Sequence, residues 1–166
     1  MARGRQRGEA DTASRILDIA ERLVQSRGFN AFSYADIASE LAGAASKAIE
    51  AGMAADRITV DPGLGFGKSL DGNLVLLRYL AAFRALGFPV AVGASRKAFV
   101  RRFSGVADDA PTVDRLPGSL AALARARAAG AAIARVHDVE DSVRFVRMLE
   151  AIESPPARRP VEAAAR

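Results

Sequence analysis

The fold is decided by RITVDPGLGFGKSLDGNLVLLRYLAAFRALGFPVAVG, residues 57–93. The apolar run RITV at 57–60 predicts a short strand, which the Asp-Pro-Gly turn at 61–63 ends. Residues 70–86 then carry leucines at helical spacing, and PVAVG at 89–93 predicts a second strand. A strand, a helix and a strand in this order form a right-handed βαβ unit, so the two strands are expected to be parallel.

The same alternation continues toward the C-terminus. Residues 95–117 are predicted to be a long polar connection, 118–129 a helix, 132–136 (AIARV) a third strand and 141–152 a last helix. A further helix is predicted at 44–51, before the first strand. The sequence therefore predicts an α/β fold with about three βα units of parallel strands. Ligands of such sheets bind at the carboxyl ends of the strands.

Length and composition exclude several classes of protein. The chain has 166 residues, of which 24 are basic and 19 acidic, so the net charge is +5, which is compatible with anionic ligands. With no Cys and one His, disulfides, cysteine nucleophiles and a multi-histidine metal site are excluded. No apolar run reaches the roughly 18 residues of a membrane span, and no signal peptide is visible, so a cytoplasmic protein without membrane contact is expected.

The N-terminal part has a different, helical character. Residues 12–27 predict an amphipathic helix, and Ser33 is placed to cap a second, short helix at 34–41. The stretch TASRILDIAERLVQSRGFNAFSYADIASEL, 12–41, resembles the first two helices of the helix-turn-helix of TetR-family repressors. The following residues, AGAASKAIEAGMAADR at 42–57, depart from that family because they lack the aromatic residues of its recognition helix. DNA binding is therefore not expected.

The end of the first strand, DPGLGFGK, has the glycines and lysine of a phosphate-binding loop but matches neither common motif. A P-loop requires Gly six positions before its Lys, but that position is Pro62, which has no N–H to offer a phosphate. The dinucleotide fingerprint fails because Lys68 stands where its last Gly belongs. Two interpretations of Asp61 stay open. Its carboxylate either caps the following turn or accepts two parallel N–H bonds from an amidine-like edge, such as that of a pterin or guanine ring.

The other two strand ends carry cations. Arg96 and Lys97 follow the second strand, where they would meet an anion or a polarised carbonyl, or be ordinary surface charges. Arg135 and His137 follow the third strand, and residues two apart on a strand point to the same face. A guanidinium there can bind phosphate through two bonds or lie on an aromatic ring, while a structural role for the single His is the alternative.

Together the three strand ends resemble the C-terminal half of dihydropteroate synthase, over about residues 46–152. The resemblance is carried, in order and spacing, by ADRITVDPGLGFGKSLDGNLVLLRYL (55–80), FPVAVGASRKAFV (88–100) and RLPGSLAALARARAAGAAIARVHDVEDSV (115–143). That family is an α/β barrel that joins p-aminobenzoate to a pterin pyrophosphate with Mg²⁺ in folate synthesis. The chain is shorter than the roughly 200 residues of an eight-stranded barrel, so the resemblance implies a partial TIM barrel.

The resemblance implies a substrate site and roles within it. Asp61 would bind the amino and N3 edge of the pterin, and Lys97 would contact the pterin ring and p-aminobenzoate. Arg135 would stack on the pterin and, with His137, bind the pyrophosphate, so that Lys97, Arg135 and His137 are the expected catalytic residues. Position 98, often Ser in the family, is Ala here. The full set of expected substrate-binding residues is Asp61, Phe66, Lys68, Gly93, Ser95, Lys97, Arg135 and His137.

These observations predict a division of the chain into four parts. They are a disordered basic arm at 1–11, a repressor-like helical segment at 12–42, a synthase-like half barrel at 43–152 and a disordered tail at 153–166. The family's first five strands, which carry its metal-binding Asn, have no counterpart. A pterin-binding chain with weak or no turnover of its own is therefore expected, unless further copies in a homo-oligomer supply the rest. The alternatives are a TetR-type regulator with a foreign C-terminus and a chimeric reading frame without selected activity.

Overall fold

The computed structural model describes residues 30–154, with side chains from residue 36 onward. The predicted arm, the helix predicted over 12–27 and nearly all of the predicted tail lie outside these residues. The elements are α2 (Asn30–Glu50), η1 (Ala55–Arg57), α3 (Leu70–Arg78), η2 (Leu80–Leu86), β1 (Ala91–Val92), α4 (Ala98–Phe103), η3 (Thr112–Arg115), α5 (Leu116–Ala128), β2 (Ile133–Ala134) and α6 (Val139–Glu153).

The strands are parallel, as the sequence predicts, but they are short. β1 pairs with β2 in the register Ala91 to Ile133 and Val92 to Ala134. The predicted strand at 57–60 is reduced to one parallel bridge between Val60 and Val90, and η1 occupies its beginning. Each outer strand has one partner within residues 30–154, so pairing ends as soon as that partner turns away. On β2 this leaves the Ile133 side chain 50% exposed.

The two helices predicted at 34–41 and 44–51 are one helix, α2, so the predicted turn between them is wrong. Gly43 lies inside this helix without a positive φ, and the buried or half-buried side chains recur at helical spacing on both sides of it: Ala38, Leu41, Ala42 and Ala45. One continuous apolar stripe favours one continuous helix. The helix-turn-helix expectation therefore has no support in the described residues, and the predicted boundary between 42 and 43 falls within α2.

Two further predictions are corrected by packing. The helix predicted over 70–86 changes at Tyr79 from the α-helix α3 to the 3₁₀-helix η2. The buried residues Leu80, Phe83 and Leu86 recur every three positions, which matches the three residues per turn of a 3₁₀-helix. The connection predicted over 95–117 contains α4 and η3. The buried Phe99 and Val100 anchor α4 to the core, but six residues are too few to show helical periodicity in the sequence.

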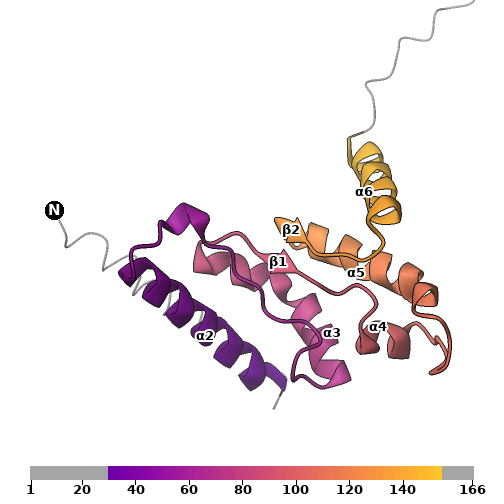
Figure 1. The fold of residues 1–166 in the computed structure, drawn as a ribbon, viewed down its shortest axis with the longest axis horizontal. Coiled ribbons are helices and arrows are strands. Elements are labelled where there is room, and N and C mark those ends of the chain that lie inside the picture. The colour runs from indigo at the N-terminus through magenta and orange to yellow at the C-terminus, as the bar shows by residue number, and fades with distance from the viewer. Residues whose placement is uncertain (1–29, 155–166) are drawn as a thin grey trace, which may run out of the picture.

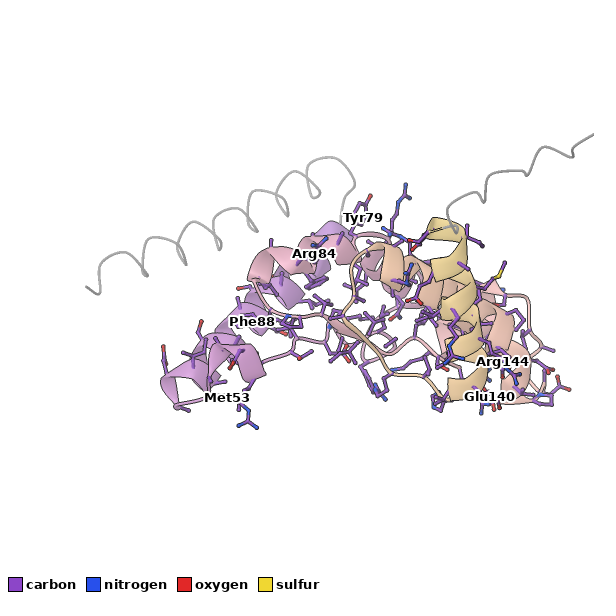
Figure 2. All side chains as sticks on the ribbon, turned by 90° about the horizontal axis from the view of Figure 1, so that it is seen from above. Met53, Tyr79, Arg84, Phe88, Glu140 and Arg144 are labelled. Carbon is purple, nitrogen blue, oxygen red and sulfur yellow. The ribbon has the colours of Figure 1, made fainter. Side chains whose placement is uncertain are left out.

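α2 packs beside α3, α3 contacts both α4 and α5, and α5 contacts α6 (Figure 1). Phe83, Leu64, Leu80 and Val90 are the largest fully buried apolar side chains, and they form the core between these helices and the strands. α6 lies at one end of the described structure, where an ion pair of 2.5 Å joins Glu140 to Arg144, and Met53 lies at the other end (Figure 2). Within residues 30–154 no helix combines the length and apolar character needed to cross a membrane.

Candidate functional site

The loop after Val60 folds back on itself. Asp61 is exposed, and its Oδ1 accepts a hydrogen bond of 2.8 Å from the Gly63 N–H, so the turn-capping interpretation of this carboxylate is observed. Lys68 Nζ donates to the carbonyl oxygens of Gly63 at 2.9 Å and Phe66 at 3.1 Å. Lys68 therefore binds its own loop. The Asp61 side chain is solvent-accessible on the same loop, and a carboxylate oxygen has lone pairs for more than one donor.

Asn73 on α3 fixes this loop from below. The side chain is buried, its Oδ1 accepts from the Gly65 N–H at 2.5 Å, and its Nδ2 donates to the Ser69 carbonyl at 2.7 Å. Both halves of the amide are thus satisfied inside the protein, as a buried polar group requires. Asn73 is not among the site residues predicted from the sequence. The sequence feature that could have indicated Asn73 is its position as a polar residue on the apolar face of the helix predicted over 70–86.

Lys97 lies where the first and second strand ends meet. Its Nζ donates to the Leu64 carbonyl at 2.6 Å and stands 3.6 Å from the centre of the Phe66 ring, which is 61% exposed. The Lys97 stem packs directly on Gly65, whose φ of +78° and missing Cβ permit this approach. Burial lowers the pKa of Lys97, and the positive charge of Arg135 lowers it further. Lys97 is therefore not an ordinary surface lysine.

Residues of the third strand end pack against the second. The guanidinium of Arg135 lies over buried Gly93, where an added Cβ would stand 2.8 Å from Nη2. His137 bonds to buried Ser95 twice, because its N–H donates to Ser95 Oγ at 3.2 Å and its Nδ1 lies 3.1 Å from the same oxygen. Arg135 and His137 thus contact positions two apart on the preceding strand end. Both are exposed on the outer side.

The residues that directly follow Ser95 and His137 form an ion pair. Arg96 Nε donates to Asp138 Oδ2 at 3.1 Å, and its Nη2 bonds to Asp138 Oδ1. The hydrogen bond from Arg96 is the main cause that lowers the pKa of Asp138, and the same bond raises the pKa of Arg96. From the sequence, Arg96 was predicted only as a cation beside Lys97, and Asp138 was not predicted to take part.

The charges gathered here suit an anionic ligand better than a metal ion. Three cations, Lys68, Lys97 and Arg135, and one carboxylate, Asp61, lie near one another, and the charges of the other three groups influence the pKa of Lys97. Mg²⁺ prefers several oxygen ligands. Within residues 30–154 no three His, Asp or Glu side chains gather as a metal site requires. The described residues therefore do not fit the Mg²⁺ that the resemblance implies.

An apolar groove adjoins the site on the side of α6. It has a volume of about 600 Å³, lies between α5, β2 and α6, and has Arg135 at its edge. Leu123, Val139 and Val143 are among its apolar lining residues. Arg135 thus borders both Gly93 and this groove, at the end of the third strand.

The sequence model of the pterin binding enzyme family matches residues 18–137, which is most of the chain. The chain therefore belongs to the family of pterin binding enzymes. The match begins at residue 18, inside the segment compared above with the repressors.

Three similar proteins of this family all carry the name dihydropteroate synthase. The chain is 40% identical over 124 residues to the dihydropteroate synthase of Neisseria meningitidis serogroup C, covering 72% of this chain and 43% of that protein. It is 42% identical over 102 residues to the dihydropteroate synthase of Escherichia coli strain K12, covering 61% and 35%. It is also 38% identical over 124 residues to the inactive dihydropteroate synthase 2 of Mycobacterium bovis, covering 74% and 38%. The chain thus spans less than half the length of these relatives.

Solved structures give the same result. Dihydropteroate synthase from Xanthomonas albilineans in complex with 7,8-dihydropteroate superposes with a TM-score of 0.70 at 35% identity, covering 75% of this chain and 46% of that one. The enzyme from Thermus thermophilus in complex with 6HMPPP gives 0.67 at 39% identity, covering 74% and 47%. The described residues therefore have the fold of part of a dihydropteroate synthase, rich in helix around a short parallel sheet.

Proposed function

We propose that the three strand ends bind a pterin pyrophosphate, one of the two substrates of a dihydropteroate-synthase-type condensation, the other being p-aminobenzoate. The observation that carries this proposal is the contact between the first two strand ends, where Lys97 Nζ donates to the Leu64 carbonyl and the lysine stem packs on Gly65. The third strand end joins them through Arg135, whose guanidinium lies over Gly93. Asp61, Lys97 and Arg135 come from three separate segments of the sequence, yet the charges of Asp61 and Arg135 both act on Lys97.

Each group suits one part of such a ligand. The exposed Asp61 carboxylate accepts N–H bonds from the amidine-like edge of the pterin, which is a paired donor. The exposed face of Phe66 and the flat guanidinium of Arg135 offer surfaces for an aromatic ring. Arg135 also donates paired bonds to phosphate oxygens, and the exposed His137 ring adds a donor beside it.

This condensation depends more on electrostatic stabilisation of the leaving pyrophosphate than on proton transfer by a side chain. When the amine of p-aminobenzoate displaces pyrophosphate, negative charge grows on the leaving oxygen, and fixed cations stabilise that charge. Lys97 is held by its hydrogen bond to the Leu64 carbonyl, so its ammonium group needs little rearrangement as that charge develops. The Arg135 guanidinium, which lies over Gly93, adds a second positive charge. The resemblance to dihydropteroate synthase also assigns the contact with p-aminobenzoate to Lys97.

Titration calorimetry tests the proposal directly. The dihydropterin pyrophosphate should release measurable heat with the full chain, and Asp61→Asn or Arg135→Ala should weaken binding at least tenfold. Arg144→Ala is the matched control, because Arg144 is an exposed arginine whose partner is Glu140 one turn away on α6. Absence of heat with the unmodified chain, or equal affinities of Asp61→Asn and the control, would refute the proposal.

A further inference from the structure

Arg96 has an unusual backbone conformation for its residue type. Its φ is +57°, and within residues 30–154 it is the one residue other than glycine with a positive φ. A side chain in this region is disfavoured by contact between Cβ and the backbone, so the surroundings must hold it there. The two neighbours of Arg96 are Ser95 and Lys97, both of which belong to the proposed ligand site.

The beginning of α5 holds the backbone of Arg96. The Arg96 N–H donates to Ser119 Oγ at 3.0 Å, and the Arg96 carbonyl accepts from Arg115 Nη1 at 2.8 Å. Ser119 in turn donates to the Arg115 carbonyl at 2.8 Å, which joins the two partners to each other. Both backbone groups of Arg96 are therefore bonded to the junction between η3 and α5.

The side chain of Arg96 reaches the third strand end. It approaches both carboxylate oxygens of Asp138, whose side chain is only 9% exposed, while the Arg96 side chain is 29% exposed. Paired bonds between guanidinium and carboxylate fix orientation as well as distance. Asp138 directly follows His137, just as Arg96 directly precedes Lys97.

We propose that the Arg96–Asp138 ion pair sets the position of the second strand end relative to the third, and that Arg96 is a positioning residue for the ligand site. The pair lies next to the ligand-facing groups on each segment. It therefore aligns Ser95 with His137, and Lys97 with Arg135, without touching the ligand. This inference rests on the proposed function for its consequence in binding, but the alignment itself can be observed without ligand.

Three variants separate the contributions. Arg96→Lys keeps the charge and loses the paired bonds, and Asp138→Asn keeps the shape and loses the charge. Arg96→Gly also removes the ion pair, but glycine adopts a positive φ without strain, so this variant should keep its fold. It is the variant to use if Arg96→Lys or Asp138→Asn lowers the melting temperature. Arg127→Lys is the matched control, because the Arg127 side chain is also 29% exposed and pairs with Glu153 at 2.5 Å, between α5 and α6.

The readouts are two. Amide hydrogen exchange and the ring ¹H–¹⁵N signals of His137, the only histidine in the chain, report its contact with Ser95 in the absence of ligand. Calorimetry with pterin pyrophosphate reports binding. In each Arg96 or Asp138 variant we expect the His137 amide to exchange at least tenfold faster and the His137 ring signals to shift. We also expect these variants to bind pterin pyrophosphate at least tenfold more weakly. Arg127→Lys should match the unmodified chain in all three measurements.

The outcomes distinguish the two proposals. Unchanged exchange and ring signals in Arg96→Gly and Asp138→Asn would overturn the positioning role, whatever the binding result. Faster exchange confined to these variants would support that role, even in a chain that gives no heat with pterin pyrophosphate, and that lack of heat would refute only the proposed function. Equal acceleration in Arg127→Lys would show a general loss of stability and would also overturn the inference.

Discussion

Replacing Gly93 with alanine would separate ligand binding from stability at the end of β1. A Cβ at Gly93 would stand 2.8 Å from Nη2, 3.2 Å from Cζ and 3.3 Å from Nε of Arg135. A contact of 2.8 Å is too short for a carbon atom, so the guanidinium must move. It is the exposed end of a flexible side chain, so it moves at little cost to the fold.

The two effects have different magnitudes. Hydrogen bonds to charged groups contribute about 1.5–3 kcal/mol, so a displaced Arg135 that loses one of them weakens pyrophosphate binding roughly 10- to 150-fold. Gly93 has no positive φ, so alanine fits its backbone and lowers the entropy of the unfolded chain. The free energy of unfolding is therefore expected to stay level or rise by about 0.4–1 kcal/mol.

Calorimetry with inorganic pyrophosphate and urea unfolding measure the two effects on the same protein. Gly43→Ala on α2 is the control, because an added Cβ there meets nothing within 4 Å and a helical Gly-to-Ala change stabilises by about 1 kcal/mol. The control should therefore gain stability and keep its affinity. Affinity of Gly93→Ala within twofold of the unmodified chain would refute the argument that Gly93 positions Arg135 on the phosphate.

Three further predictions concern single groups. Asn73→Ala breaks two buried hydrogen bonds and leaves a loop amide without its acceptor, so it should cost about 2–4 kcal/mol in urea unfolding. Arg96 lowers the folded-state pKa of Asp138 below the ordinary 3.8, so this carboxylate stabilises the fold above that pH and the effect is lost as pH falls through the lower folded value. The stability advantage over Asp138→Asn should thus be complete at pH 6 and vanish in stronger acid. Burial and then the charge of Arg135 lower the pKa of Lys97, so its ε-methylene NMR signal should titrate below 10.5.

Each of these has a contrary result. A loss under 1 kcal/mol in Asn73→Ala would show that water replaces its amide. A constant difference between the unmodified chain and Asp138→Asn from pH 6 to pH 2 would show that the ion pair is not formed. Titration of the Lys97 signal at 10.5 or above would place its ammonium group in open solvent.

The parallel order of the strands and the residues at their ends could be predicted because both follow from short, local patterns. RITV, PVAVG and AIARV are each recognisable alone, and the chain-order rule then brings Asp61, Lys97 and Arg135 to one edge. Strand length could not be predicted in the same way, because a strand persists only where a neighbour pairs with it.

Other features depend on contacts that the sequence does not display. The helix α2 continues through Gly43, although glycine often marks the end of a helix. It continues because the burial of Ala38 and Ala45 on either side outweighs the cost of one glycine. Arg96 and Asp138 are 42 positions apart, so nothing local connects them. Their pairing follows only from the fold.

The outer edge of β2 has a consequence for the protein in solution. Ile133 and Ala134 are exposed, neither is charged, and within residues 30–154 the strand pairs only with β1. Natural edge strands usually carry a lysine, a proline or a bulge that discourages further pairing. Shortness is a protection of its own, and β2 has only two residues. Self-association through this edge should therefore be weak and appear only at high protein concentration, and an Ile133→Lys change should abolish it.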